Sequence, residues 1–220
     1  VLFITCLAQH LDDFVEAVEE AGITVVNVAA SPIAASLITL TQTQRIAGCV
    51  LVNIGAETVS LAVFENDKPT SLEVFPIGSV DITNDIALGL KIPLDEAEDL
   101  KVNRDRMTSS RKKLDEIIVA RLSDIFELIE AHLKKIGRNG LLPAGIVLTG
   151  GGAGIDLVEQ LAKNSLRLPA KLASVIHPKS RGTNSDVAKS AITIKDATWA
   201  VAYGLCILGL TAESDDAMHV

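Results

Sequence analysis

Three consecutive apolar segments between residues 49 and 76 restrict the possible folds of this chain more than any other feature of its sequence. Cys49–Ile54, Val59–Glu65 and about Ser71–Pro76 each have the length and the Val, Ile and Leu content of a β-strand. Because only short polar segments join them, we expect the three strands to form an antiparallel meander. The first connection, Gly55–Thr58, lacks the Asn-Gly or Asp-Gly pair that favours the tightest hairpin turns. A role beyond turning the chain therefore has to be considered for it.

The region before the meander alternates between strand-like and helix-like patterns. Val1–Ile4 and Val25–Ala29 are short apolar segments, which we predict to be strands. His10–Glu20 repeats apolar residues at helical spacing and is predicted to be a helix. A second helix is expected to follow, with Ser31 as its N-cap and Pro32 at its first position.

The region after the meander is mainly helical. Its expected elements are a helix after Gly78, an acidic helix start within Ile92–Val102, a long helix over Lys112–Ile136, a strand at Gly145–Leu148, helices at Ile155–Asn164 and Ala197–Leu210, and a polar loop at His177–Ser190. Hydrophobic residues make up 48% of the chain and aromatic residues only 3%, which suits aliphatic strands covered by helices on both faces. The order predicts an α/β fold, with a three-stranded meander and βα units, but not a doubly wound dinucleotide-binding fold.

Charge and residue usage argue against several classes of function. The formal net charge of −8 disfavours a nucleic-acid partner, because the phosphates would be repelled. No segment approaches the roughly 20 consecutive apolar residues of a membrane-spanning helix. Cys6, Cys49 and Cys206 lie in apolar surroundings at wide spacing. We predict them to be small buried hydrophobic residues and not metal ligands or disulfides.

Two segments expose backbone in a way that suits a ligand. Successive N–H groups in a tight turn such as Gly55–Thr58 can hold an anion, and a glycine lets a phosphate approach the chain. At Gly150–Gly152 a predicted strand ends and a helix follows, so the glycines can present N–H groups or flat peptide planes to a ligand. Neither segment matches a P-loop or a dinucleotide fingerprint, and each by itself is compatible with an ordinary turn.

Taken together, these segments resemble a known group of proteins. The order of hairpin loop, helical insertion and strand–glycine–helix unit is similar to the second half of the actin/Hsp70/hexokinase ATPase superfamily. Four stretches resemble the bacterial cell-division family FtsA: "VNIGAETVSLAVFENDKP" its second phosphate loop, "FPIGSVDITNDIALGLKIPLDEAEDLKV" the link to its smaller lobe, "LPAGIVLTGGGAGI" its adenosine motif, and "WAVAYGLCILGL" its closing helix. The resemblance covers nearly the whole chain, which we expect to be the carboxy-terminal half of such a protein.

The resemblance implies an actin-like (ribonuclease H-like) ATPase fold with a small helical inserted lobe. The implied divisions are residues 1–27 as the end of the extra lobe that distinguishes FtsA from actin, residues 28–85 and 143–212 as the core nucleotide-binding subdomain, residues 86–142 as the inserted smaller lobe, and residues 213–220 as a tail. The passage from Lys101 to Ser109 is shorter than in the family, which generally has a β-containing excursion there. That smaller lobe contacts the tubulin-like protein FtsZ in FtsA proteins, so a true deletion would reduce the docking surface.

The resemblance also implies a site for ATP and Mg²⁺. The residues expected at the β- and γ-phosphates are Gly55, Ala56, Glu57 and Thr58, and those expected at the adenosine are Gly150, Gly151 and Gly152. Glu98 and Lys101 would face the ribose or the purine, because residues at i and i+3 share a helix face. The alternative for these two residues is a solvated ion pair within the helix.

Two positions depart from the family's phosphate loop, whose usual form is Asp-Ile-Gly-Gly-Gly-Thr-Thr-Asp. Asn53 stands in place of the first Asp, and Ser60 replaces an acidic residue at the far end. An Asp would help to hold Mg²⁺ or its waters, whereas the Asn53 amide brings no charge and could act only through water. We therefore expect nucleotide binding with at most slow ATP hydrolysis.

The function implied by the resemblance is that of an ATP-binding cell-division protein. Such a protein would polymerise into filaments and link the FtsZ ring to the cytoplasmic membrane at the division septum, anchored through a segment outside this sequence. The alternatives are a PilM-like ATP-binding protein of pilus or secretion assembly, and a nucleotide-free filament scaffold of the same fold. A sugar kinase or metabolic ATPase is disfavoured by Asn53, because it would require a catalytic carboxylate.

Overall fold

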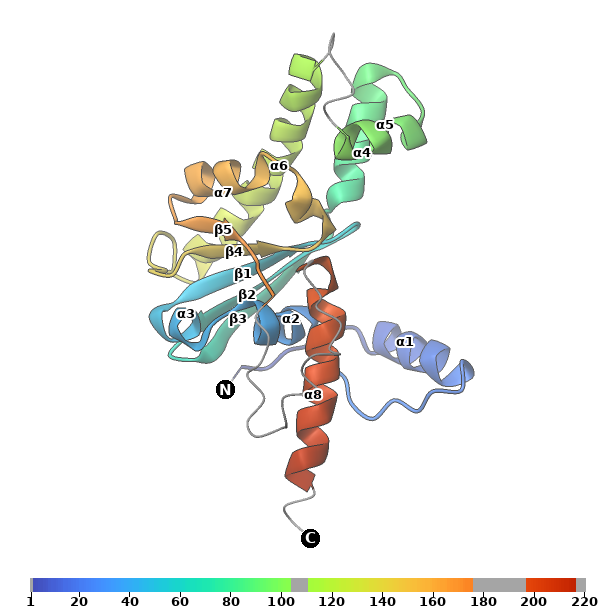
Figure 1. The fold of residues 1–220 in the computed structure, drawn as a ribbon, viewed down its shortest axis with the longest axis vertical. Coiled ribbons are helices and arrows are strands. Elements are labelled where there is room, and N and C mark those ends of the chain that lie inside the picture. The colour runs from blue at the N-terminus through green and yellow to red at the C-terminus, as the bar shows by residue number, and fades with distance from the viewer. Residues whose placement is uncertain (1, 104–110, 176–196, 217–220) are drawn as a thin grey trace, which may run out of the picture.

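A mixed five-stranded β-sheet lies at the centre of the molecule in the computed structural model, which describes residues 2–103, 111–175 and 197–216 (Figure 1). The strand order is β3-β2-β1-β4-β5. The predicted meander is confirmed, because β1 (Cys49–Ile54), β2 (Val59–Glu65) and β3 (Lys68–Phe75) pair antiparallel. On the other side of β1, strands β4 (Ile146–Thr149) and β5 (Ala170–Leu172) are added in parallel.

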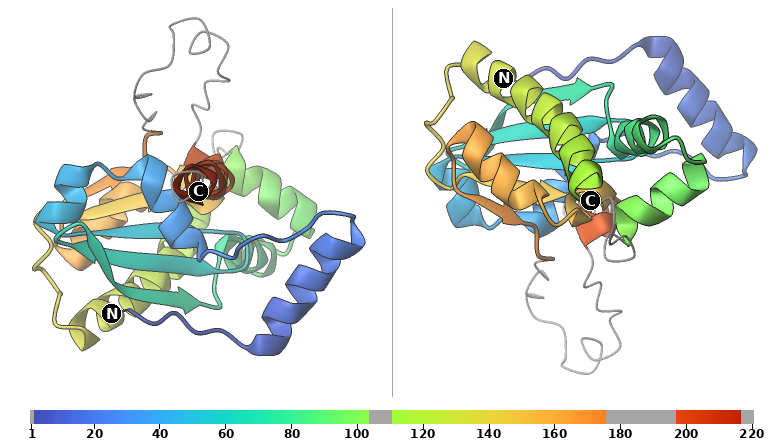
Figure 2. Two further views of the ribbon diagram at one scale, coloured as in Figure 1. Left: turned by 90° about the horizontal axis from the view of Figure 1, so that it is seen from below. Right: turned by 90° about the horizontal axis from the view of Figure 1, so that it is seen from above.

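Helices cover both faces of this sheet. The described helices are α1 (Ala8–Glu20), α2 (Ser31–Thr39), α3 (Gln42–Ala47), α4 (Ser79–Leu90), α5 (Leu94–Val102), α6 (Arg111–Lys135), α7 (Val158–Leu166) and α8 (Ala200–Asp216), with the 3₁₀ turns η2 (Gly151–Gly154) and η3 (Ala197–Trp199). Residues of α4, α6 and α7 share a hydrophobic cluster with one face of the sheet, and residues of α2 and α8 share a second cluster with the other. Figure 2 shows α6 and α8 on opposite faces of the sheet.

The central strand β1 is buried on both faces, which explains its continuous apolar sequence. Val50, Val52 and Ile54 belong to the cluster on the α6 side, whereas Cys49 and Leu51 belong to the cluster on the α8 side. Helix α6 contributes side chains with no exposed surface, each stabilising the fold by about 1.5–3 kcal/mol: Leu114, Ile118, Leu122, Ile125, Phe126, Ile129 and Leu133. Helix α6 belongs to the predicted smaller lobe, residues 86–142, but its side chains share one core with the strands. The division of the chain into two lobes therefore stays a prediction.

The turn between β2 and β3 is tighter than the sequence suggested. We expected the strand to begin near Ser71, but β3 begins at Lys68 and only Asn66 and Asp67 lie between the strands. Both have positive φ, 52° and 63°, which Asn and Asp tolerate best among side-chain-bearing residues and which matches the twist of a two-residue hairpin. The Asp67 carboxylate accepts a hydrogen bond from Arg45 Nε at 2.7 Å, so α3 is attached to this turn.

The prediction of two strands before the meander is wrong. Residues 2–4 and 25–29 have no strand structure, and Val26 is 94% exposed. An apolar run becomes a strand only where a neighbouring strand pairs with it, and the described part of the chain supplies none at these positions. The helix predicted over His10–Glu20 is confirmed as α1, although none of its described side chains is buried.

Helix boundaries also differ from those expected. Ser31 lies inside α2, and its N-cap is Ala30, which makes no side-chain cap. Helix α3 was not predicted, although its capping box joins Thr41 and Gln44, a Thr-x-x-Gln pattern typical of a helix start. The terminal helix extends to Asp216, beyond the expected end at Leu210.

A buried histidine connects α6 to the outer strand of the meander. His132 is 7% exposed, and its Nε2 lies 2.8 Å from Ser71 Oγ, while its Nδ1 lies 3.2 Å from the Glu73 carboxylate. Burial lowers the pKa of His132 below its usual value, although the Glu73 charge partly opposes the shift. We therefore regard His132 as a neutral packing residue with satisfied polar atoms.

The cysteines only partly match their prediction. Cys49 is buried, and burial raises the pKa of its thiol to about 11. Cys6 and Cys206 are exposed, so their prediction as core residues is wrong. Within the described residues, no helix combines the length and apolar character needed to cross a bilayer. Residues 104–109 of the short passage after Lys101, and the polar loop at 177–190, lie outside the described residues.

Candidate functional site

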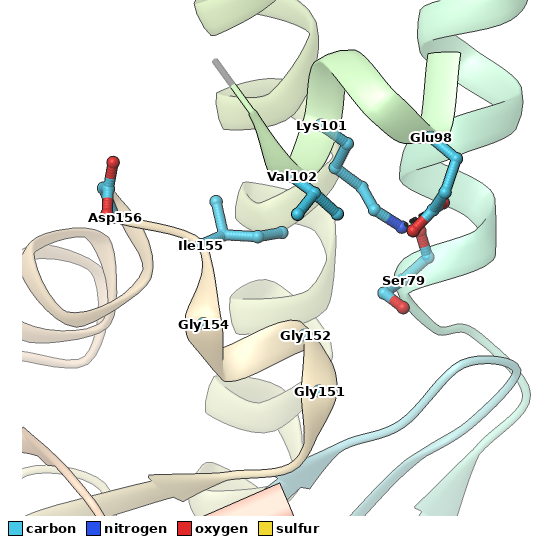
Figure 3. A pocket seen from close by; sticks show the side chains of 9 residues that line it. All are labelled: Ser79, Glu98, Lys101, Val102, Gly151, Gly152, Gly154, Ile155 and Asp156. Atoms are coloured by element: carbon cyan, nitrogen blue, oxygen red, sulfur yellow. Dashed lines mark hydrogen bonds and ion pairs between the residues drawn. The ribbon is translucent and has the colours of Figure 1, made fainter. Parts of the chain in front are cut away.

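A cavity of about 280 Å³ lies where α4, α5 and η2 meet (Figure 3). Its lining residues are Ser79, Glu98, Lys101, Val102, Gly151, Gly152, Gly154, Ile155 and Asp156. Four of the ten residues predicted for the site from sequence therefore line one cavity, although they come from two distant parts of the chain: Glu98, Lys101, Gly151 and Gly152. The other six lie outside the lining, namely Asn53, Gly55, Ala56, Glu57, Thr58 and Gly150.

The glycine segment after β4 is packed against β1 on one side and open on the other. Gly150 has a φ of +90°, and a Cβ atom there would lie 2.3 Å from Asn53 Oδ1 and 2.5 Å from the Ile54 carbonyl oxygen. A Cβ atom at Gly152 would lie 2.4 Å from Ile54 Cγ2. At Gly151, by contrast, nothing lies within 4 Å of that position. Gly150 and Gly152 are thus required for packing, whereas Gly151 leaves backbone free to face a ligand.

Glu98 and Lys101 form an ion pair that is not the solvated pair considered above. Lys101 Nζ lies 2.7 Å from Glu98 Oε2, but only 6% of the Lys101 side chain is exposed, compared with 50% of the Glu98 side chain. Lys101 Nζ also donates to Thr83 Oγ1 at 2.8 Å and to the Ser79 carbonyl oxygen at 3.0 Å. All three protons of the ammonium group can therefore be satisfied by protein acceptors.

Thr83 completes this polar network. Its hydroxyl group donates to Glu98 Oε2 at 2.5 Å while accepting from Lys101. Burial disfavours the charge on Glu98, but the hydrogen bonds from Lys101 and Thr83 outweigh it and hold the pKa of this carboxyl group below its usual range. Glu98 is therefore an anionic, half-exposed hydrogen-bond acceptor at the edge of the cavity.

The hairpin loop Gly55–Thr58 lies beside the cavity but does not line it. Gly55 N donates to the Thr58 carbonyl oxygen at 2.9 Å, which closes the loop. The other residues of the loop, Ala56, Glu57 and Thr58, are exposed, and their backbone N–H groups donate to no acceptor within the described part of the chain. Consecutive unpaired N–H groups in a turn suit an anion such as a phosphate.

Asn53 lies between the hairpin loop and the glycine segment. It pairs in register with Ser60 on β2 and with Thr149 on β4, so these three polar residues form a row across one face of the sheet. The Asn53 side-chain amide lies directly against Gly150, since a Cβ atom added to this glycine would lie 2.3 Å from Asn53 Oδ1. Among the described residues, no group of three or more His, Cys, Asp or Glu side chains could hold a metal ion.

Ser79 and Thr83 were not predicted for the site, and neither were the lining residues Val102, Gly154, Ile155 and Asp156. A signal for the first two was present, since Ser79 opens the helix after Gly78 and Thr83 lies one turn later on the same face. Ser79 matters because it touches both halves of the site. Its N–H donates to the Gly55 carbonyl oxygen at 2.9 Å, while its own carbonyl oxygen accepts from Lys101.

Solved structures place this arrangement in a fold class. MreB5 of Spiroplasma citri bound to ADP superposes with a TM-score of 0.74 and 16% identity, covering 96% of this chain and 68% of that one. A PilM–PilN type IV pilus biogenesis complex gives a TM-score of 0.69 and 23% identity over 90% of this chain and 57% of that one. The archaeal actin homologue Ta0583 gives a TM-score of 0.58 and 17% identity over 83% of this chain and 55% of that one. The sheet and its two loops therefore define a protein of the actin-like ATPase fold, as predicted.

Sequence comparison narrows this class to one family. The family model for cell division protein FtsA matches residues 50–204. Cell division protein FtsA of Pseudomonas aeruginosa is 28% identical over 96% of this chain and 54% of its own length, and that of Bacillus subtilis is 31% identical over 78% and 44%. The protein thus belongs to the FtsA cell-division family, and the predicted resemblance is confirmed. The chain spans about half the length of the curated relatives it matches.

Proposed function

We propose that the protein binds ATP in the cavity between α4, α5 and η2 and acts as an actin-like component of the bacterial cell-division machinery. The observation that carries this proposal is the meeting of Glu98 and Lys101 with Gly151 and Gly152 around one cavity. Membership of the FtsA family supports it, as do the structures of MreB5 of Spiroplasma citri bound to ADP and to AMPPNP, which share the fold.

The residues present fit an adenine nucleotide. Glu98 offers a half-exposed carboxylate that can accept hydrogen bonds from the two ribose hydroxyl groups. The open backbone at Gly151 can lie against the adenosine, and the unpaired N–H groups of Ala56, Glu57 and Thr58 can receive the phosphates. Gly55, Gly150 and Gly152 then shape the loops and need not touch the ligand, since each of them approaches backbone or side-chain atoms of its own neighbours.

Hydrolysis of the bound ATP is proposed to be slow at most. A magnesium ion would neutralise charge on the phosphates. The chain offers it Asn53, whose amide can orient a metal-bound water but adds no negative charge. The neighbouring Ser60 is 4% exposed and equally uncharged. A site that binds ATP but hydrolyses it slowly suits a protein whose conformation is controlled by whether nucleotide is bound.

The wider role that we propose rests on the family. The protein would assemble into filaments with copies of itself and join an FtsZ-like tubulin homologue to the inner face of the cytoplasmic membrane at the division septum. The membrane contact would use a segment outside the described residues. A PilM-like role in pilus assembly is the second candidate, favoured only by the likeness in fold to the PilM–PilN complex, whereas the sequence relationship is to FtsA.

Thermal unfolding of the protein at its full natural length, with and without Mg-ATP, tests the proposal. At a hundredfold excess of ligand over the dissociation constant, binding should add about 2.7 kcal/mol to the free energy of unfolding. An Asn53→Asp variant should bind Mg-ATP with the same affinity as the parent protein and hydrolyse it faster. Absence of a shift in both proteins would contradict nucleotide binding and favour a nucleotide-free scaffold. Co-sedimentation with FtsZ, compared with co-sedimentation with a PilN-type partner, separates the division role from the pilus role.

A further inference from the structure

Lys101 occupies an unusual place for a residue that was expected to touch the nucleotide. Its side chain is 6% exposed, and its ammonium group already has three acceptors within the protein, on Ser79, Thr83 and Glu98. Donating to a ribose or purine would require it to give up one of these acceptors, in a nearly buried position where an unsatisfied charge is costly. Glu98 is the opposite case, because its side chain is half exposed at the edge of the same cavity.

The contacts of Lys101 lead instead to the hairpin loop. Its Nζ holds the carbonyl oxygen of Ser79, and the N–H of Ser79 donates to the carbonyl oxygen of Gly55 at 2.9 Å. The next residue, Val80, donates to the carbonyl oxygen of Ala56 at 2.8 Å. The first turn of α4 is thus fixed to α5 by Lys101 and fixed to the loop by two backbone hydrogen bonds.

The fit between α4 and the loop leaves little freedom. A Cβ atom at Gly78 would lie 2.2 Å from the Ala56 carbonyl oxygen and 2.7 Å from the Glu57 carbonyl carbon, so the chain that enters α4 lies directly against the loop. Gly78 N also donates to the Asp81 carboxylate at 2.8 Å, which fixes the start of the helix. A displacement of Ser79 would therefore be passed directly to the N–H groups of Ala56, Glu57 and Thr58.

We infer that Lys101 is a positioning residue, which holds the Gly55–Thr58 loop in its phosphate-binding geometry through Ser79 and does not itself bind the nucleotide. The inference rests on the proposed nucleotide site. It assigns the two residues of the ion pair different tasks. Glu98 contacts the nucleoside, and Lys101 sets the affinity for the phosphates through the first turn of α4.

Equilibrium binding of adenosine and of ADP to the protein at its full natural length separates these tasks. In Lys101→Met, the affinity for ADP should fall about tenfold, the effect of losing one charge-assisted hydrogen bond, while the affinity for adenosine stays within about twofold of the parent. In Glu98→Gln, which can still accept from Lys101 and Thr83, both affinities should fall by the same factor. Lys112→Met is the matched control, because this lysine on α6 is 93% exposed, and it should change neither affinity.

The outcomes distinguish this inference from the proposal it rests on. If adenosine binding falls as much as ADP binding in Lys101→Met, the effect of Lys101 is not confined to the phosphates and the inference is overturned. If the parent binds neither ligand, the nucleotide site itself is overturned and the inference with it. If Lys101→Met does not fold, Lys101→Gln carries the same test, since it removes the charge but keeps a hydrogen-bond donor at this nearly buried position. It too should weaken ADP selectively, and an equal loss of adenosine would overturn the inference.

Discussion

Replacing Gly150 by Ala should destabilise the fold strongly, because this glycine joins the glycine segment to β1. Its φ of +90° lies in the left-handed region, where a side chain costs about 1–2 kcal/mol. The added Cβ atom would also lie 2.3 Å from Asn53 Oδ1 and 2.5 Å from the Ile54 carbonyl oxygen. Relieving such overpacking costs about 1–3 kcal/mol, so the expected total is about 2–5 kcal/mol.

Two other glycines separate the two contributions. Gly137 has a φ of +69° with nothing within 4 Å of its Cβ position, so Gly137→Ala should show only the backbone cost of about 1–2 kcal/mol. Gly154 has neither a positive φ nor a close neighbour, so Gly154→Ala should stay within about 0.5 kcal/mol of the parent. Urea denaturation measures all three as shifts in the midpoint at constant m-value. Equal stability of Gly150→Ala and Gly154→Ala would refute the close packing of this segment on β1.

Two further predictions concern titrating groups. Burial lowers the pKa of His132, so below about pH 6.5 the unfolded chain binds a proton at this histidine that the folded chain does not. The free energy of unfolding should therefore decrease as the pH falls through this range, and the decrease should be smaller in His132→Gln. An unchanged slope in the variant would contradict the buried neutral histidine. Burial raises the pKa of Cys49 to about 11. At pH 8 a thiol reagent should therefore modify the exposed Cys6 readily and Cys49 only after unfolding, which peptide mass spectrometry can measure. Modification of both cysteines at the same rate would contradict the buried position of Cys49.

Elements with a strong periodic pattern could be predicted from the sequence. The strands of the meander, the long helix α6 and the glycine segment carry signals that do not depend on distant residues, namely apolar strand runs, helical spacing and glycine itself. The segment Val25–Ala29 shows the limit of such reasoning. Its composition favours a strand, but no partner strand lies beside it in the described part of the chain.

The candidate cavity could be predicted only in part, because four of the ten residues proposed from the sequence line it. Spacing alone placed Glu98 and Lys101 on one helix face. Which of the two would be buried depends on α4, since Ser79 and Thr83 supply the acceptors that surround the Lys101 ammonium group. Likewise, the sequence gives no reason to distinguish Gly150, Gly151 and Gly152 from one another. In the structure, Gly150 and Gly152 lie against Asn53 and Ile54, whereas Gly151 is open.

The most direct test of the nucleotide site is the binding of Mg-ATP, measured by calorimetry, to the parent protein and to Gly151→Val. Nothing lies within 4 Å of a Cβ atom at Gly151, so the larger side chain should be accommodated without loss of folding stability while it fills the cavity beside Glu98 and Lys101. We predict that the parent binds Mg-ATP and that Gly151→Val, with an unchanged free energy of unfolding, binds at least about tenfold more weakly, a loss of about 1.4 kcal/mol. Equal affinities in the two proteins would contradict a nucleotide site in this cavity.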